Sequence, residues 1–466
     1  ASGPKDIPET VTQASGTAGK AMQLLSGVRD TLTIEPEFPP ERDIAGQEPR
    51  IGVFVCQCGI NIGGTVDVPG VAEYAGTLPD VVYTEDNLYT CSQDTQGHIR
   101  DMIVEHNLNR VIVASCTPRT HEPLFRETLK NAGLNPYLFE MTNIRDQCSW
   151  VHMKEPEKAT IKSKDLVRMA VSKARLLEPL YESSMKIRSG AVVIGGGIAG
   201  MTASLSLAEQ GFEVNLVEKD KELGGNLRHL HFLSNGSDPR MILNETVRKA
   251  ENHPNIKVWK NASIESIDGF VGNFTTTIAQ NKKKTEVEHG AVIVASGASE
   301  YTPTEYMYDS SSAVLTQSEL EEKLAKGKLK AKNIVMIQCV GSREEGHMYC
   351  SRVCCNTAVK NALKIKELNP ETEIYILYRD MRTYGFNEKY FQEAREKGVI
   401  FIRHEIENKP EFTINGDMQI KIDEPLLAKE LILRPDLLVL SSRIDANADN
   451  ETIAKMLKIP LNQDGF

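Results

Sequence analysis

The chain has 466 residues, of which 40% are apolar and 25% charged, a composition typical of a globular protein with roughly three domains. Its net charge of −10 argues against nucleic acid or an anionic membrane surface as the main partner. No apolar run approaches the roughly 20 residues that cross a bilayer, and no signal peptide opens the sequence. Nine cysteines without a secretory context indicate the cytoplasm, where cysteines are ligands or redox groups before they are disulfides.

Residues 1–49 are rich in Pro, Thr, Ser and acidic residues. This composition predicts a linker or docking segment, with one short amphipathic helix from Val11 to Val28. The sequence starts with Ala1 and stops at Phe466 without the segment that usually completes a flavin domain. We therefore expect a piece of a longer protein.

Residues 50–180 alternate strands and helices, which predicts an α/β domain with a parallel sheet. Three of its five cysteine positions come at the carboxyl ends of predicted strands, and those ends converge on one crevice in a parallel sheet. Four thiolates that meet there suit a 4Fe–4S cluster, whereas separate buried cysteines are the alternative. The expected ligands are Cys58, Cys91, Cys116 and Cys148, with Cys56 as the spare cysteine.

Residues 181–300 have the pattern of the first part of an FAD-binding domain. An apolar strand runs into the spacing Gly195, Gly197, Gly200, a helix follows, and a second strand ends at Glu218. This order gives a tight turn, a close approach to a pyrophosphate and a carboxylate for the ribose hydroxyls. A later strand enters a second glycine turn, so FAD is the expected ligand and NAD the minor alternative. The candidate contacts are Gly195, Gly197, Ile198, Gly200, Glu218, Lys219, Gly224, Gly225, Asn226, Ser296 and Gly297.

Residues 301–430 correspond to the NAD(P)H-binding module of such flavoproteins, and 431–466 return to an incomplete FAD domain. After the strand at 333–337 only Gly341 remains of a glycine fingerprint, and four cysteines occupy the region instead, namely Cys339, Cys350, Cys354 and Cys355. The last two open a helix, whose N-terminus stabilises thiolates. We infer that an iron–sulfur cluster has replaced the nicotinamide as electron partner. Zinc is the main rival, although the Cys-x-x-Cys pairs of zinc sites are absent, and buried structural cysteines are a further alternative.

The most specific motifs resemble the A subunits of the heterodisulfide reductases, the flavin and iron–sulfur subunits of methanogen-type complexes, over residues 50–466. They are Cys56–Ile62, Ala114–Pro123, Gln147–His152 and the stretch from Gln338 to Cys355. The resemblance implies an oxidoreductase of α/β fold. An N-terminal parallel-sheet cysteine domain precedes thioredoxin-reductase-like, two-dinucleotide-binding domains of Rossmann type. It also implies one FAD and two 4Fe–4S clusters, one of them on the loop cysteines and close to the flavin. Lys360 is similar to a lysine that tunes the flavin ring, with a solvated helix lysine as the alternative.

In that family FAD is expected to split an electron pair, with one electron going to ferredoxin and one to the heterodisulfide of coenzymes M and B in methanogenesis. The implied partners are B- and C-like subunits, ferredoxin, and a hydrogenase or formate dehydrogenase linker subunit. The implied assembly is a cytoplasmic hetero-oligomer that contains a dimer of this chain.

Two departures from the family point to a fragment or to one half of a tandem fusion. No Cys-x-x-Cys-x-x-Cys run of a ferredoxin module occurs, and only a short Lys-rich connection joins Phe274 to His289. Residues 4–25 resemble a segment that normally follows the flavin domain. Two other functions stay open. One is an NAD(P)H-dependent disulfide reductase that uses Cys354–Cys355 or Cys350–Cys354, and the other is a non-catalytic scaffold half of a duplicated protein.

Overall fold

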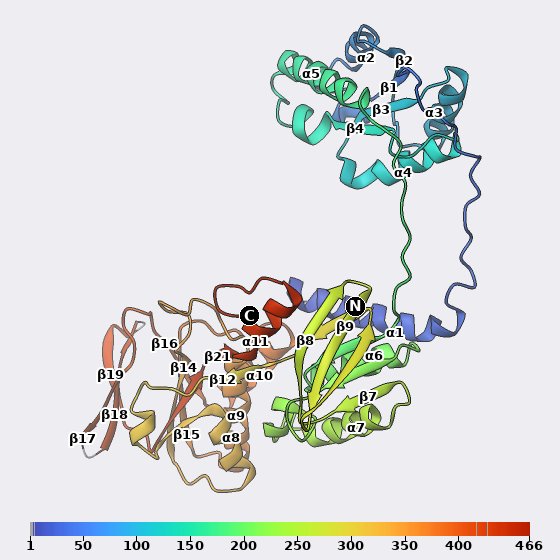
Figure 1. Ribbon diagram of the computed structural model, residues 1–466. Helices are drawn as coiled ribbons and strands as arrows, with labels where there is room; N and C mark the ends of the chain where they lie inside the picture. The colour runs from blue at the N-terminus through green and yellow to red at the C-terminus, as the bar shows by residue number, and fades with distance from the viewer. Residues whose placement is uncertain (1–2, 4, 416, 426) are drawn as a thin grey trace. The chain divides into compact units, whose positions relative to one another are not determined.

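The computed structural model describes residues 3, 5–415, 417–425 and 427–466. They form two compact units, coloured by residue number in Figure 1. The small unit comprises Thr33–Met185, and the large unit comprises Ala1–Leu32 together with Lys186–Phe466. The segment 1–49 is therefore divided between the two units.

The small unit is built on a four-stranded parallel sheet in the order β2-β1-β3-β4. All residues of β1 and β3 are buried, as expected for parallel strands that are covered on both faces. Successive side chains of β1 enter opposite cores: Val53 and Val55 pack on one side and Phe54 on the other. The strands are β1 Ile51–Cys56, β2 Val81–Asn87, β3 Arg110–Ser115 and β4 Phe139–Asn143.

Four helices enclose this sheet in pairs (Figure 1). One pair, α2 and α5, covers the face of Val53, and the other pair, α3 and α4, covers the face of Phe54. A π-helical turn, η3, follows β4, and a short 3-10 turn, η2, follows β1. Their bounds are α2 Val68–Gly76, α3 Gln93–Glu105, α4 Pro118–Asn131, α5 Pro156–Ala174, η2 Gly59–Asn61 and η3 Arg145–Ser149.

In the large unit, the first part of Lys186–Phe466 forms a parallel sheet in the order β11-β5-β6-β7. Helices α6 and α7 cover one face, and an antiparallel sheet in the order β10-β9-β8 covers the other together with α11 (Figure 1). The elements are β5 Ala191–Ile194, α6 Ile198–Ala208, β6 Val214–Val217, α7 Pro239–Asn252, β7 Ile256–Trp259, β8 Ala262–Phe270, β9 Asn273–Gln280, β10 Lys283–His289, β11 Ala291–Val294 and α11 Asp449–Leu457.

A second parallel sheet follows in the order β13-β20-β14-β15-β16. Helices α8, α9 and α10 pack on one face, and the antiparallel strands β17, β18 and β19 pack on the other. The bounds are β13 Val314–Thr316, α8 Gln317–Ala325, β14 Asn333–Val340, α9 Cys354–Leu368, β15 Glu373–Tyr378, α10 Glu388–Glu396, β16 Ile400–Arg403, β17 Glu411–Asn415, β18 Asp417–Glu424, β19 Lys429–Leu433 and β20 Leu437–Ser442.

The strands β12 Ala298–Glu300 and β21 Ile444–Ala446 pair between these two halves of the large unit. Residues 186–466 also contain three short 3-10 turns, η4 Gly225–His229, η5 Tyr308–Ser310 and η6 Gly385–Asn387. Two parallel-sheet modules in succession, each covered by helices and by a small antiparallel sheet, form a two-module α/β architecture of Rossmann type. The predicted α/β fold class is confirmed.

The chain start forms α1 Ile7–Leu25 and η1 Ser26–Val28, and α1 packs beside α6 (Figure 1). The helix begins four residues before the predicted Val11, because Asp6 caps it by accepting a hydrogen bond from the Glu9 N–H at 2.7 Å. Arg29 then fastens the segment, since its guanidinium donates to the Gln210 carbonyl at 3.2 Å and lies over the Phe212 ring. Across the described residues, no helix has the length and apolarity to span a bilayer.

Candidate cofactor sites

The turn between β5 and α6 requires glycine at two positions. Gly195 has a φ of 107°, which side chains rarely adopt. A Cβ on Gly200 would lie 1.8 Å from the Gly195 carbonyl oxygen, so only glycine lets the helix pack this closely on the strand. A Cβ on Gly197 would meet no atom within 4 Å, so the first turn of α6 faces open space. Free N–H groups of a helix start beside such a space suit a phosphate.

A second glycine turn lies against the first. The Gly224 N–H donates to the Gly196 carbonyl at 2.8 Å, and a Cβ on Gly225 would lie 3.3 Å from Gly197. The buried Glu218 carboxylate accepts from the Gly196 N–H at 2.6 Å and from the Asp220 N–H at 2.8 Å. This carboxylate is therefore held at the edge where a dinucleotide presents its ribose. The residues fit an adenine dinucleotide.

The other predicted dinucleotide contacts surround the same edge of the sheet. Ile198 is the first residue of α6, and the Asn226 amide donates to the Ala298 carbonyl at 2.9 Å. Gly297, with a φ of 75°, also faces open space. Lys219 instead makes an exposed ion pair with Asp449 at 2.9 Å.

Sequence reasoning missed two asparagines that form hydrogen bonds with Ser296, another of the predicted contacts. Its hydroxyl donates to Asn450 at 2.9 Å, and the Asn447 amide donates to its carbonyl at 2.6 Å. Both asparagines come from the return segment, about 150 residues later in the chain. No local pattern marks such a long-range contact.

The four cysteines of the second module gather where β14 ends and α9 begins. Cys339 is the last residue but one of β14 and has a φ of 61°, and Cys354 and Cys355 are the first two residues of α9. The Cys354 thiol hydrogen-bonds to Cys355, which lowers the pKa of Cys355 to about 7 and raises that of Cys354. Cys350 is close enough to Cys354 to raise the Cys354 pKa further. The structure thus brings together all four predicted ligands of this loop.

Guanidinium groups surround this loop of thiols. Arg343 approaches the Cys339 sulfur at 4.0 Å, and the buried Arg379 donates to the Cys339 carbonyl at 3.3 Å. Burial raises the pKa of Cys339, and both arginines oppose that shift. Gln338, the residue before Cys339, is buried with neither amide atom hydrogen-bonded within the described structure. Four thiols beside cationic groups and an unsatisfied amide fit an iron–sulfur cluster.

Lys360 is buried, which excludes the alternative of a solvated helix lysine. Its ammonium forms an ion pair with Glu321 at 2.6 Å and donates to the Phe232 carbonyl at 3.1 Å, and it also lies over the Phe232 ring. Glu321 in turn accepts from the His231 N–H at 2.7 Å. The pair therefore connects α8 and α9 to the segment that follows η4 of the dinucleotide module. No sequence pattern indicates Glu321 as the partner.

In the small unit, four of the five cysteines lie at the carboxyl edge of the sheet. Cys56 ends β1, and its sulfur accepts from the Thr90 N–H at 3.4 Å. Burial raises the pKa of Cys91 and of Cys116, and the thiolate of Cys56 raises both further. Arg145 opposes both shifts, and its guanidinium lies 3.9 Å from the Cys58 sulfur. Electrostatic interactions with one another or with Arg145 thus connect four thiols at this edge, those of Cys56, Cys58, Cys91 and Cys116.

Cys148, the other predicted ligand, faces a different element. It lies in η3 and is fully buried, with its sulfur 3.2 Å from the Ala159 carbonyl and 3.3 Å from the Ser163 hydroxyl of α5. Cys56, which was expected to be the spare cysteine, lies among the edge thiols instead.

All nine cysteines are unbonded to one another. Among the residues that the structure describes, no three Cys, His, Asp or Glu side chains are placed to hold one metal ion. A single zinc ion needs four ligand atoms within about 2.3 Å of one point, whereas a 4Fe–4S core keeps its four cysteine sulfurs well apart. Thiols that are too widely spaced for a single ion are compatible with cluster ligands.

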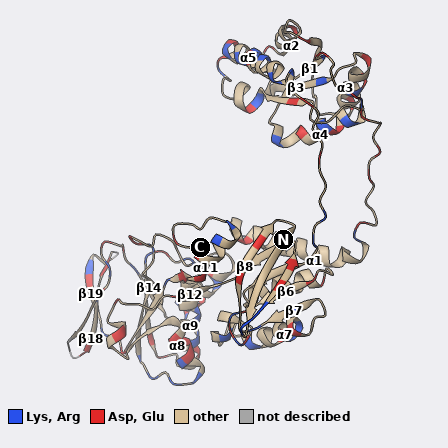
Figure 2. Ribbon diagram, viewed as in Figure 1, with Lys and Arg blue, Asp and Glu red and all other residues tan. Residues whose placement is uncertain are grey.

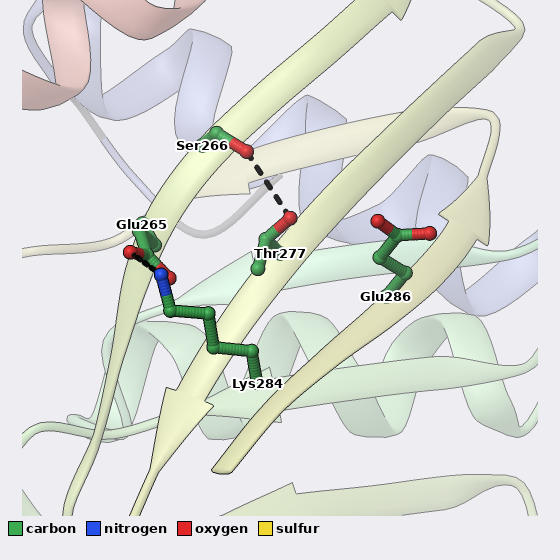
Figure 3. Close-up of a pocket in the computed structure, with 5 residues that line it drawn as sticks. All are labelled: Glu265, Ser266, Thr277, Lys284 and Glu286. Carbon is green, nitrogen blue, oxygen red and sulfur yellow. Dashed lines mark hydrogen bonds and ion pairs between the residues drawn. The ribbon is translucent and has the colours of Figure 1, made fainter. Parts of the chain in front are cut away.

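A hollow of about 610 Å³ lies on the outer face of the antiparallel sheet β8-β9-β10 (Figure 3). An ion pair between Lys284 and Glu265 and a hydrogen bond from Ser266 to Thr277 at 3.1 Å bridge its strands. These groups satisfy one another, as in ordinary cross-strand pairs. The candidate cofactor sites lie at the carboxyl edges of the three parallel sheets and not at this hollow.

A family model described as pyridine nucleotide-disulphide oxidoreductase matches residues 190–337. The chain is 37% identical to an A-type iron–sulfur subunit of the CoB–CoM heterodisulfide reductase of Methanopyrus kandleri, over 91% of this chain and 79% of that protein. It is 36% identical to the A-type subunit of the H(2):CoB-CoM heterodisulfide,ferredoxin reductase of Methanothermobacter thermautotrophicus, over 90% and 78%. It is 33% identical to the A-type subunit of the H(2)/formate:CoB-CoM heterodisulfide,ferredoxin reductase of Methanococcus maripaludis, also over 90% and 78%.

The alignment to the Methanopyrus protein has 522 positions, more than the chain has residues, so that relative carries residues within the aligned span that are absent here. The relatives and the matched family model agree with the two dinucleotide-type modules of the large unit. The chain is a flavin-dependent oxidoreductase and belongs to the family of heterodisulfide reductase A subunits.

Proposed function

We propose that the chain is the electron-transfer component of a heterodisulfide reductase-type complex and binds one FAD and two 4Fe–4S clusters. The observation that carries this proposal is the cysteine loop at the carboxyl end of β14. In a nicotinamide-dependent flavoprotein this turn would hold a pyrophosphate, but here it presents Cys339, Cys354 and Cys355 beside arginines. When bound, FAD would take up an electron pair from a partner and the clusters would accept electrons singly.

The chain's own groups share the task of holding FAD. Gly197 and Gly297 leave room for the pyrophosphate, and the start of α6 offers it N–H groups. The Glu218 carboxylate, which accepts from the Gly196 N–H, would also accept from the ribose hydroxyls. The ion pair of Lys360 with Glu321 fixes the segment after η4 to α8 and α9. When FAD is bound, Lys360 is the lysine that would tune the flavin ring.

The loop cluster is held by Cys339, Cys350, Cys354 and Cys355. For the small unit we propose Cys56, Cys58, Cys91 and Cys116, which replaces the predicted Cys148 by Cys56. The supporting contacts are those of Arg145 with the edge thiols and those of Cys148 with α5. Cys148 then serves as a packing residue between η3 and α5.

The partners follow from the names of the relatives, which mention H(2), formate, ferredoxin and the CoB–CoM heterodisulfide. We infer B- and C-like subunits, ferredoxin, and a hydrogenase or formate dehydrogenase linker subunit as partners, in a cytoplasmic hetero-oligomer that contains a dimer of this chain. Bifurcation of the electron pair between ferredoxin and the heterodisulfide is the proposed reaction of that complex. Basic and acidic residues are interspersed over both units (Figure 2), which suits contacts with several protein partners better than a single polyanion.

A second candidate is an NAD(P)H-dependent disulfide reductase. The observation that favours it is the hydrogen bond between the adjacent thiols of Cys354 and Cys355. Against it, the turn directly after β14 keeps only Gly341 of a glycine fingerprint, so it lacks the glycines that let a pyrophosphate approach the backbone closely. Rapid bleaching of the flavin by NADPH would support this candidate over the first.

The experiment is redox-titrated EPR spectroscopy, with iron analysis, on anaerobically purified Cys355→Ala, Cys56→Ala and Cys148→Ala variants. Cys355→Ala should lose the loop-cluster signal alone, and Cys56→Ala should lose the small-unit signal alone. Cys148→Ala is the matched control and should retain both. If Cys355→Ala keeps every cluster signal, the proposed role of the loop is wrong. Loss of the small-unit signal in Cys148→Ala but not in Cys56→Ala would support the ligand set predicted from the sequence, in which Cys148 is a ligand and Cys56 is not.

A further inference from the structure

Buried polar atoms without a hydrogen-bond partner gather near the carboxyl edge of the small unit's sheet. Buried polar groups are almost always paired in folded proteins, so a local group of unpaired ones indicates a missing partner. Within the described structure they include the Asn87 Oδ1, Thr90 Oγ1, Asn143 Nδ2, Arg145 Nε and Asp146 Oδ1 atoms.

Strand register places these residues beside the edge thiols. Asn87, the last residue of β2, pairs with Cys56, the last residue of β1. Asn143, the last residue of β4, pairs with Ser115, which precedes Cys116. Thr90 follows β2 directly, and its backbone N–H already donates to the Cys56 sulfur. Three of the unpaired atoms are donors, on Thr90, Asn143 and Arg145, and sulfur atoms are the acceptors that lie nearby.

Arg145 brings a positive charge to the same place. Its Nη1 atom lies 3.9 Å from the Cys58 sulfur, and its guanidinium lies over the Trp150 ring with 5.0 Å between the charge and the ring centroid. The carboxylate of Asp146 is 4.0 Å from Nε, too far for a hydrogen bond. The charge is thus held in position by Trp150 and is only weakly compensated by Asp146.

We propose that Arg145, Thr90 and Asn143 are positioning residues for the small unit's cluster, to whose sulfurs they donate hydrogen bonds, and that Arg145 raises its reduction potential. This inference rests on the proposed function, which places a 4Fe–4S cluster on Cys56, Cys58, Cys91 and Cys116.

The step concerned is a one-electron reduction in which no bond forms or breaks. The electron comes from the reduced flavin in the working protein or from dithionite in a titration. Each added electron makes an already anionic cluster more negative, so a nearby guanidinium and N–H or O–H donors make reduction easier. The direction of the effect therefore follows from the sign of the charge alone.

The test is a potentiometric EPR titration of the full chain, with wild-type protein and an Arg145→Gln variant side by side. Arg145→Gln should lower the equilibrium constant for reduction of the small-unit cluster about tenfold, which is about 59 mV for one electron. Arg145→Lys keeps the charge and should recover most of the potential. Thr90→Val removes one donor at nearly constant volume and should lower the constant about threefold. Arg168→Gln is the control, because that exposed arginine pairs with Asp165 on α5 and its loss should leave the potential unchanged.

An unchanged potential in both Arg145→Gln and Thr90→Val, with the cluster retained, overturns the proposal and leaves the proposed function intact. If Arg145→Gln cannot hold the cluster, Thr90→Val alone decides by the same criterion. A wild-type chain with no small-unit cluster signal contradicts the proposed function first and this inference with it.

Discussion

At the scale of single residues, a substitution of Gly197 should reduce cofactor binding without affecting folding. Its φ of −68° is ordinary, and a Cβ there would meet no protein atom within 4 Å. Gly197→Val should therefore fold normally and fill the space for the pyrophosphate. We expect flavin content to fall at least about tenfold, and the melting temperature of the flavin-free protein to stay within about 2 °C of wild type.

The matched control for that substitution is Gly16→Ala. Gly16 lies on the exposed side of α1, and a Cβ there would meet no atom within 4 Å, so the change should stabilise the helix by about 0.5–1 kcal/mol and leave the flavin in place. A Gly197→Val protein that retains a full complement of flavin would show that the dinucleotide is held elsewhere.

Lys360 and Glu321 form a buried ion pair, and such pairs are costly to break from one side. Lys360→Met leaves the Glu321 carboxylate without its counter-ion and should lower the free energy of unfolding by about 3–5 kcal/mol. The double variant Lys360→Met/Glu321→Leu removes both charges and should regain most of that loss. Urea denaturation of the three proteins measures the difference. Equal losses in the single and double variants would mean that the pair contributes nothing through its charges.

At the scale of elements, the small unit has the contacts of an independent domain. Its flanking segments fold back onto it: Arg42 donates to the Leu108 carbonyl at 2.8 Å, and the Asn135 amide donates to the Leu180 carbonyl at 3.1 Å. Residues 33–185 expressed alone should therefore unfold cooperatively and, after iron and sulfide are supplied anaerobically, bind about four irons. Circular dichroism melting and iron analysis test this. If the fragment is unfolded, or folds without binding iron, the small unit requires the large unit for folding or for cluster binding.

Sequence patterns predict an element well when a local run of apolar residues reflects its burial. The runs at β1, β3, β5 and β14 are almost wholly apolar, and each is a buried parallel strand. The glycine spacing after β5 predicts a turn that only glycines can form, because the close contact of Gly200 with Gly195 is set by backbone alone. Placing cysteines at strand ends also predicts where the thiols of the small unit collect.

The parts that patterns did not reveal depend on long-range contacts. The packing of η3 against α5 places the Cys148 sulfur 3.3 Å from the Ser163 hydroxyl, a contact that the sequence does not indicate. The partner of Lys360 lies 39 residues away on α8, and Asn450 reaches Ser296 across 154 residues. These pairings are products of tertiary structure, so neither periodicity nor motif spacing contains them.

At the scale of the whole molecule, two parallel-sheet modules and a separate α/β unit each have a candidate cofactor site at the carboxyl edge of a sheet. One edge carries glycines, and the other two carry cysteines with arginines beside them. Such an arrangement suits the conversion of a two-electron input into single electrons, because a flavin handles pairs and clusters handle single electrons. The names of two relatives, an iron–sulfur subunit and a subunit of a ferredoxin reductase, are consistent with single-electron carriers in this family.

The most direct measurement is the content of iron, acid-labile sulfide and flavin in the anaerobically purified chain, combined with a test for reduction by NADPH. Two 4Fe–4S clusters and one FAD predict about eight irons, about eight sulfides and one flavin per chain, with no bleaching of the flavin by NADPH. A protein that contains flavin but no iron, and whose flavin NADPH reduces rapidly, would contradict the account.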